Sequence, residues 1–104
     1  MTHTPDVLVI GGGVIGLTCA WRLAQRKLRV TLVERGRCGD GASGAALGAL
    51  IPAPPTRTTP LPLLHRRSLS LFPDFAAELH ERSGIDVRYE RCGRLERVQT
   101  PQRL

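Results

Sequence analysis

Cysteine, lysine and aromatic residues are scarce in this chain of 104 residues, and each scarcity narrows the possible functions. The three cysteines, Cys19, Cys38 and Cys92, are odd in number and show no C-x-x-C spacing. They predict neither a disulfide framework nor a zinc site, so we expect a reducing, cytoplasmic location. His65 and His80 lack partners at metal-ligand spacing, and we expect no metal site.

The formal net charge of +6 is compatible with a nucleic-acid partner, but other features oppose it. Fourteen of the fifteen basic residues are Arg, and they are scattered along the chain. Only four aromatic residues could stack on bases. The charge therefore predicts no nucleic-acid binding. The apolar N-terminal stretch has no basic segment before it and is interrupted by glycines, so it predicts neither a signal peptide nor a transmembrane segment.

The strongest pattern lies directly behind a short apolar run, Val7–Ile10, which is typical of a strand in a parallel sheet. Gly11, Gly13 and Gly16 then satisfy the dinucleotide-binding pattern G-x-G-x-x-G. Gly11 permits a tight turn, Gly13 leaves room for a pyrophosphate, and Gly16 lets the next helix pack close to the sheet. These three glycines are candidate cofactor-binding residues.

Helix-compatible residues run from residue 14 to residue 26. The first turn of such a helix presents free backbone N–H groups and the positive end of the helix dipole to a phosphate. Val14 and Ile15, in that first turn, are therefore candidate phosphate contacts as well.

A second strand is expected at residues 29–33, and Glu34 follows it, 18 positions beyond Gly16. A carboxylate at this place is suited to accept hydrogen bonds from the ribose hydroxyls of an adenosine. It also disfavours NADP, because a 2′-phosphate would be repelled. Arg35 could lie beside the adenosine, and a solvated loop residue is the equal alternative.

Residues 41–52 (GASGAALGALIP) are mostly small, so another surface can approach their backbone closely. Ser43 could cap a short helix or donate a hydrogen bond to a phosphate. From the residues alone, this stretch could equally be a tightly packed connection between a helix and a strand.

Three segments together resemble the N-terminus of the FAD-dependent D-amino-acid oxidase superfamily: VIGGGVIG at 9–16, VER at 33–35 and the stretch at 41–52. Within it they are most similar to glycine oxidases of the thiamine-biosynthesis type, and residues 72–95 are similar to that family's helix and hairpin. The resemblance implies cofactor contacts from the small-residue stretch: Ala42, Ser43, Leu47, Gly48 and Ala49. It also implies noncovalent FAD, since the histidine that carries the flavin in some relatives has no counterpart at 40–52.

The expected fold class is α/β, a partial Rossmann-like FAD-binding domain followed by a helix and a short β-hairpin. We assign residues 1–52 to the FAD-binding βαβ core, 53–62 to a loop rich in proline and threonine, and 63–104 to the helix and hairpin that begin a substrate-side region. Pro73 should kink or split the helix, and Gly84 should cap its end. The hairpin is expected to pair residues 86–90 with 94–98.

The chain is expected to be a truncated piece, because the helix-start signature Thr100-Pro101 is followed by only three residues. The first strand would also keep an unpaired edge, which favours a partner chain or a homo-oligomer.

Three functions remain open. The first is the N-terminal FAD-binding part of an oxidoreductase that acts on the C–N bond of glycine or another small amino acid. The second is a noncatalytic dinucleotide-binding module or small subunit completed by a partner chain, and the third is part of an NAD-dependent dehydrogenase. The small-residue stretch favours flavin over NAD. No residue is assigned to catalysis, because the family's substrate-binding groups would lie beyond residue 104.

Overall fold

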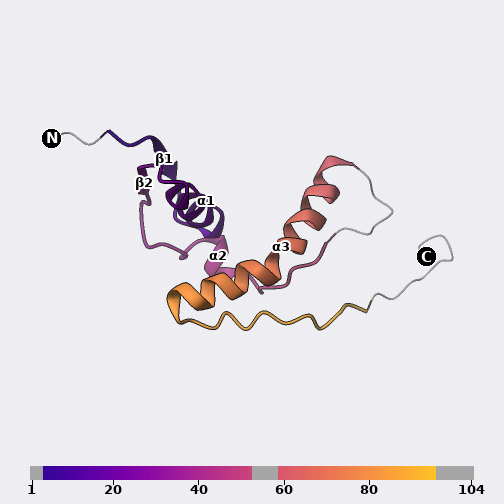
Figure 1. The fold of residues 1–104 in the computed structure, drawn as a ribbon. Coiled ribbons are helices and arrows are strands. Elements are labelled where there is room, and N and C mark those ends of the chain that lie inside the picture. Colours follow the sequence, from indigo (N-terminus) through magenta and orange to yellow (C-terminus); the bar gives the residue numbers. More distant parts are fainter. Residues whose placement is uncertain (1–3, 53–58, 96–104) are drawn as a thin grey trace. The chain divides into compact units, whose positions relative to one another are not determined.

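A computed structural model describes residues 4–52 and 59–95, which fall into two compact units, Met1–Ala49 and Leu50–Leu104 (Figure 1). The elements, in chain order, are β1 (Val7–Ile10), α1 (Val14–Gln25), β2 (Val30–Val33), α2 (Ala42–Ala45) and α3 (Pro60–Ser83). The first unit contains both strands with α1 and α2, and the second contains α3. The assignment of these units to a cofactor core and a substrate-side region stays a prediction.

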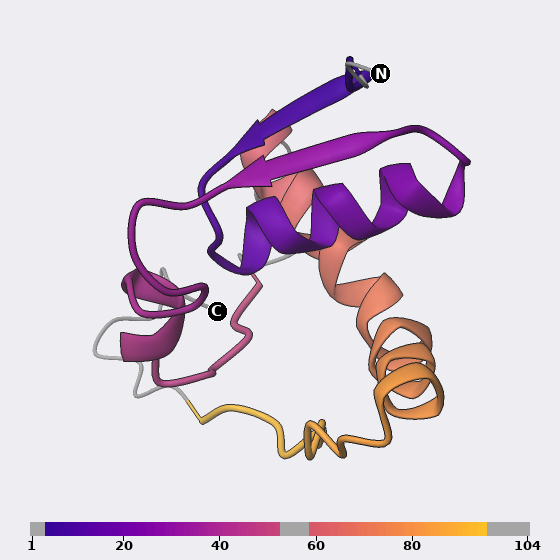
Figure 2. The same cartoon turned by 90° about the vertical axis from the view of Figure 1, so that its left-hand side faces the viewer.

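The first unit is built on a βαβ arrangement, as the sequence predicts. Strands β1 and β2 are parallel and in register from Val7 opposite Val30 to Ile10 opposite Val33. Figure 2 shows α1 lying along the two strands that it connects. The predicted α/β class is confirmed, and the boundaries of both strands and of α1 agree with the sequence to within one residue.

The two faces of this small sheet differ in burial, because side chains alternate along each strand. Val9 lies on the face that α1 covers, where its side chain approaches Gly16. Leu8 and Ile10 lie on the other face, and Ile10 is 81% exposed. Within the described residues β1 also pairs on one side only. The sheet therefore has an apolar face and an edge that the described residues leave open.

An ion pair joins the beginnings of the two strands. The Asp6 carboxylate accepts hydrogen bonds from the Arg29 backbone N–H at 2.8 Å and from its guanidinium at 2.7 and 3.1 Å. The Asp6 N–H in turn donates to the Arg29 carbonyl at 2.9 Å. These bonds favour the charged carboxylate and lower the pKa of Asp6 to about 2. The pairing fixes the register where the strands begin.

Helix α3 begins earlier than predicted. The loop was expected to extend to Pro62, but the helix starts at Pro60, directly after Thr59 in extended conformation. Proline suits the first position of a helix, because its fixed φ is already helical and its missing N–H would have no partner there. The prolines at 60 and 62 therefore belong to the first turn of α3, and residues 53–58 lie outside the described residues.

Pro73 bends α3 without dividing it. The helix is continuous from Pro60 to Ser83 with Pro73 inside it, and Figures 1 and 2 both show its axis changing direction along its length. Proline lacks the N–H for a helical hydrogen bond and displaces the preceding turn, which accounts for a bend. Gly84 ends the helix, as predicted, and its N–H donates to the His80 carbonyl at 2.8 Å.

The predicted hairpin is wrong in the part of the chain that the structure describes. Residues 85–95 contain no strand, and 96–98 lie outside the described residues. The Arg88 N–H donates to the Asp86 side chain at 2.8 Å, and Arg88 has a φ of +51°. This side-chain turn and a left-handed residue interrupt the extended backbone that a strand needs. Tyr89 instead stacks on Phe72 of α3, with ring centroids 5.9 Å apart.

No helix among the described residues is both long enough and apolar enough to span a bilayer.

Candidate dinucleotide site

The predicted cofactor residues begin at one edge of the sheet, where both parallel strands end. Gly11 follows β1, and its N–H donates to the Val33 carbonyl of β2 at 2.9 Å. Glu34 follows β2 directly. Gly11 has a φ of +107°, which residues other than glycine adopt only with strain. The carboxyl edge of the sheet therefore carries both the turn and the acid that the sequence predicts.

The glycine loop (residues 11–16) leads into α1 and leaves its first N–H groups available. Gly13 is the N-cap residue of α1, and as a glycine it has no side chain that could bond the first N–H groups of the helix. The Val14 N–H donates to the Ser43 hydroxyl at 2.8 Å. Among the described residues, the N–H groups of Gly13, Ile15 and Gly16 have no acceptor. This end of α1 combines unpaired donors with the positive end of a twelve-residue helix, which is an arrangement that binds anions.

Neighbouring atoms leave little room beside two glycines of the loop. A Cβ on Gly16 would overlap the Gly11 carbonyl oxygen, so only glycine allows α1 to start this close to the turn. A Cβ on Gly13 would lie 3.1 Å from the Ser43 hydroxyl oxygen. The backbone of Gly13 therefore borders a narrow space between the helix and α2.

Glu34 is held by the backbone around it. One carboxylate oxygen accepts the Gly12 N–H at 2.7 Å, and the other accepts the Gly36 N–H at 2.9 Å. Both hydrogen bonds favour the charged form, so they lower the pKa of Glu34 below its ordinary value. A carboxylate oxygen can accept more than one hydrogen bond, so Glu34 can also accept hydrogen bonds from ribose hydroxyls. Its side chain also joins the loop after β2 to the glycine loop.

The small-residue stretch contacts the start of α1 through Ser43. Ala42 and Ser43 lie in α2, but Gly41 is its N-cap. Ser43 does not cap the short helix α2, and its hydroxyl accepts the Val14 N–H at the start of α1 instead. Its hydrogen bond to a phosphate stays a prediction. Leu47, Gly48 and Ala49 follow α2 without regular structure, and the Leu47 side chain is 95% exposed.

The turn between β2 and α2 contains contacts that sequence reasoning missed. The Gly39 N–H donates to the Gly12 carbonyl at 2.9 Å, and a Cβ on Gly12 would lie only 2.7 Å from the Cys38 sulfur. A Cβ on Gly44 would overlap the Gly39 carbonyl oxygen. The glycine spacing at 39 and 44 could have indicated a close approach of two backbones. Cys38, which the sequence marks only as structural or idle, carried no such signal.

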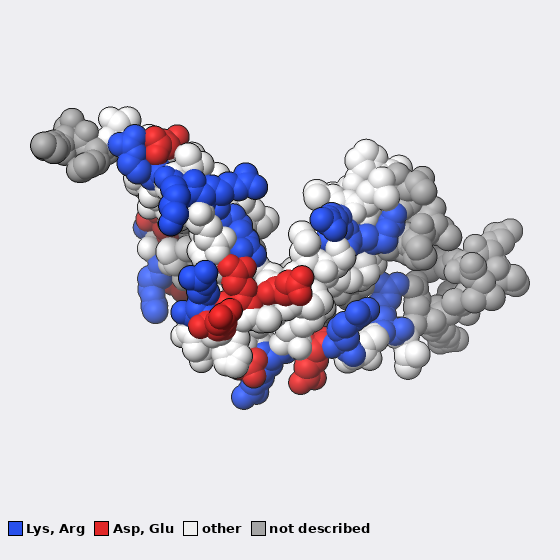
Figure 3. Space-filling view, viewed as in Figure 1, with Lys and Arg blue, Asp and Glu red and all other residues white. Residues whose placement is uncertain are grey.

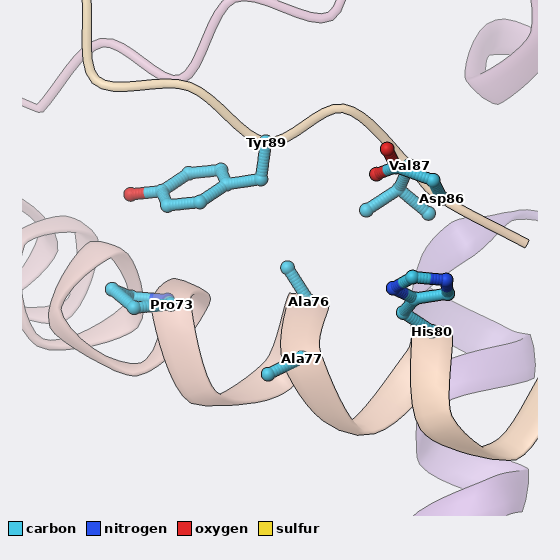
Figure 4. Close-up of a pocket in the computed structure, with 7 residues that line it drawn as sticks. All are labelled: Pro73, Ala76, Ala77, His80, Asp86, Val87 and Tyr89. Carbon is cyan, nitrogen blue, oxygen red and sulfur yellow. The ribbon is translucent and has the colours of Figure 1, made fainter.

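The described part of the second unit contains an open depression of about 210 Å³ between α3 and the segment after it. Figure 4 shows Ala76 and His80 projecting from α3 toward Val87 and Tyr89. Its lining includes one histidine and one aspartate, His80 and Asp86, and no group of three or more His, Cys, Asp or Glu that could hold a metal occurs in the described residues. Nothing in this hollow marks it as a second cofactor site.

The basic residues are unevenly spread on the face that Figure 3 shows. Several Lys and Arg side chains of the described residues lie side by side over one part of that face, and acidic and uncharged side chains cover the rest. The predicted absence of a nucleic-acid partner stays a prediction.

The residues at the sheet edge fit the diphosphate and ribose of a dinucleotide. The N–H groups of Gly13, Ile15 and Gly16 suit a pyrophosphate, and the carboxylate of Glu34 suits a ribose.

Comparison with known proteins identifies the family. Residues 6–102 match the family described as DAO, FAD dependent oxidoreductase. This chain belongs to that family. The match covers nearly the whole sequence, and it favours the flavin interpretation over an NAD-dependent dehydrogenase.

Individual relatives agree with this result. The glycine oxidase of Geobacillus kaustophilus is 46% identical over 88 residues, which are 84% of this chain and 23% of that protein. The putative thiamine biosynthesis oxidoreductase ThiO of Rhizobium etli is 57% identical over 47 residues, 44% of this chain and 14% of that protein. The crystal structure of glycine oxidase from Bacillus cereus superposes with a TM-score of 0.75 at 44% identity, covering 84% of this chain and 23% of that one.

The solved glycine oxidase and the family match show that the βαβ unit is that of an FAD-binding fold. The chain spans about a quarter of the length of the glycine oxidases it matches.

Proposed function

We propose that this chain supplies the FAD-binding part of a flavin-dependent oxidoreductase that oxidises the C–N bond of glycine or another small amino acid. The observation that carries the proposal is the set of unpaired N–H groups at the start of α1, beside the carboxylate of Glu34. The names of the similar glycine oxidases support the substrate class, and the similar ThiO protein supports a role in thiamine synthesis.

Each part of the site has its own role in this proposal. The glycine loop and the first turn of α1 bind the pyrophosphate, Glu34 accepts the ribose hydroxyls, and Arg35 borders the adenosine. The small-residue stretch borders the flavin side through Ala42, Ser43, Leu47, Gly48 and Ala49. FAD is held noncovalently, because residues 40–52 contain no histidine to carry it.

FAD held by these residues would supply the hydride-accepting chemistry that the oxidation needs. This chain's residues orient the dinucleotide and neutralise its phosphates. No group within residues 4–52 and 59–95 is assigned to the amine or carboxylate of a substrate. We therefore expect the 104 residues alone to bind FAD without oxidising amino acids.

A specific observation favours a second candidate, a module completed by another chain. The open sheet face is apolar, with Leu8 55% and Ile10 81% exposed, and β1 has a free edge within the described residues. Such a surface favours association with further protein. Size-exclusion chromatography measures this directly, and a stable monomer with a free sheet edge would argue against it.

The main test is FAD binding by the purified chain, followed by titration with flavin fluorescence. We expect saturable binding that Gly13→Val abolishes, because a branched side chain would enter the space between Gly13 and Ser43. Assays of hydrogen peroxide from glycine, sarcosine and D-alanine should be negative. Binding that Gly13→Val leaves unchanged would refute the site, and turnover by the chain alone would refute the division of roles.

A further inference from the structure

The peptide between Gly12 and Gly13 is only weakly restrained by covalent structure. It lies between two glycines, so neither neighbour carries a Cβ that would oppose its rotation. Turning this peptide over exchanges the directions of the Gly12 carbonyl and the Gly13 N–H. The orientation of one of the pyrophosphate donors therefore depends on contacts from outside the loop.

The turn after β2 provides those contacts on three sides of Gly12. The Glu34 carboxylate accepts the Gly12 N–H at 2.7 Å, and the Gly39 N–H donates to the Gly12 carbonyl at 2.9 Å. The Cys38 sulfur occupies the side where a Cβ would be, 2.7 Å from its ideal position. Glu34, Cys38 and Gly39 therefore contact Gly12 at its N–H, beside its Cα and at its carbonyl.

The trans geometry of the Gly12–Gly13 peptide determines the direction of the Gly13 N–H. The structure has no cis peptide bond among the described residues, and in a trans peptide the C=O and the following N–H point to opposite sides. Since the Gly12 carbonyl points at Gly39, the Gly13 N–H points away from the turn, where it has no acceptor among the described residues. This is the orientation in which it can donate to an anion at the start of α1.

We propose that Cys38 is a positioning residue of the dinucleotide site, which packs on Gly12 so that the Gly39 hydrogen bond keeps the Gly13 N–H directed at the pyrophosphate. This inference rests on the proposed function, because it assigns the anion to that site. Cys38 itself contacts no phosphate. It acts through the Gly12–Gly13 peptide. Together with the Glu34 side chain, it occupies the space that a Cβ on Gly12 would need.

The first test compares Cys38→Ala with the parent chain, and uses Cys92→Ala as the matched thiol control. Removing the sulfur allows the peptide to populate its reversed orientation, and the apparent affinity falls with the competent fraction. We expect ADP, which carries the pyrophosphate, to bind about two- to five-fold more weakly to Cys38→Ala. Adenosine affinity should stay unchanged, because its ribose contacts Glu34 and no phosphate is present. NMR relaxation dispersion should show exchange at the Gly13 amide in this variant only.

The second test uses a double variant. Gly12→Ala places a methyl group against the sulfur, so ADP affinity should fall further than in Cys38→Ala. Gly12→Ala combined with Cys38→Ala should recover part of that loss, since removing the sulfur relieves the clash. If the double variant loses less ADP affinity than the two single variants lose in total, Gly12 and Cys38 interact directly.

The outcomes separate this inference from the proposed function. If the parent chain binds neither FAD nor ADP, the proposed function fails, and this inference falls with it. If the parent binds both, but Cys38→Ala matches Cys92→Ala in ADP affinity and in Gly13 dynamics, the site stands and the positioning role of Cys38 is wrong. Equal losses for ADP and adenosine in Cys38→Ala would also overturn the role, because they would indicate a general loss of structure.

Discussion

The side-chain hydrogen bonds span longer distances in sequence in the first unit of the chain than in the second. In the first, side chains join segments that are distant in sequence: Glu34 binds Gly12, and Ser43 binds Val14, 29 residues away. In the second, hydrogen bonds such as Ser83 to Leu79 and Arg88 to Asp86 join close neighbours, and Tyr89 stacks on Phe72. The comparison teaches that a binding site depends on contacts between distant segments, since these fix several donors and acceptors at one place.

The largest expected effect comes from Gly16→Val in the first unit. A side chain here would overlap the Gly11 carbonyl oxygen, so α1 must move away from the sheet edge. Overpacking of this kind costs about 1–3 kcal/mol, and more where backbone is the obstacle. FAD binding and amide hydrogen-exchange protection of β1 should both be lost.

Gly41→Ala is the matched control for that variant. Gly41 has no atom within 4 Å of an added Cβ, so the methyl group of alanine meets no neighbour there. If Gly16→Val and Gly41→Ala behaved alike, close packing at the glycine loop would not explain the site.

Gly13→Val should act on binding more than on structure. Its added side chain meets Ser43 and the space proposed for the pyrophosphate, while the sheet is not touched. We expect FAD binding below detection by fluorescence titration, with hydrogen-exchange protection of β1 and β2 retained. Loss of FAD binding together with loss of hydrogen-exchange protection would show that Gly13, like Gly16, is needed for the fold.

Glu34→Gln should have an intermediate effect. The amide has one oxygen and one NH₂ group, so it cannot accept from both Gly12 and Gly36. FAD affinity should weaken by about 1–3 kcal/mol, as when a charge-assisted hydrogen bond is lost. Calorimetric titration measures this affinity, and an unchanged dissociation constant would show that Glu34 does not bind the ribose.

Asp6→Asn should have a small effect that depends on pH. The pKa of Asp6 is lowered from 3.8 to about 2 in the folded chain, so its stabilising contribution is present above pH 4 and is lost as the pH falls toward 2. Both partners are well exposed, so the contribution is modest. Acid titration followed by β1 amide shifts should show a transition in this window that Asp6→Asn removes. An identical titration in both proteins would contradict the ion pair.

Tyr89→Ala should leave the dinucleotide site unchanged. It removes the stacking on Phe72 and frees the segment after α3, which belongs to the second unit. Amide shifts should change around Phe72 and Ala76, while FAD affinity stays equal to that of the parent. A weaker FAD affinity would show that the second unit contributes to the site.

The difference between contacts that are near and distant in sequence explains what could be predicted from the sequence. The strands at Val7 and Val30, and the glycine loop between them, follow from patterns within a few residues of each other. Glu34 was found because its spacing from the loop is characteristic. Cys38 was not, because its partner Gly12 lies far away in sequence and a thiol against a glycine leaves no pattern.

In the second unit the errors have local causes. The hairpin was predicted from alternating residues, but the turn at Asp86 and the left-handed Arg88 outweigh that pattern. The predicted start of α3 is too late, because proline is common in loops but is also favoured in the first turn of a helix, where Pro60 and Pro62 lie.

The most direct test of the central claim, that the glycine loop, α1 and Glu34 bind FAD through its diphosphate and ribose, is an amide chemical-shift map of the ¹⁵N-labelled chain with FAD. The account predicts the largest shifts at Gly13, Ile15, Gly16 and the residues flanking Glu34, with smaller ones in α2 and none around Tyr89. Shifts concentrated in α3 and residues 85–95, or the absence of shifts at the start of α1 with saturating FAD, would contradict it.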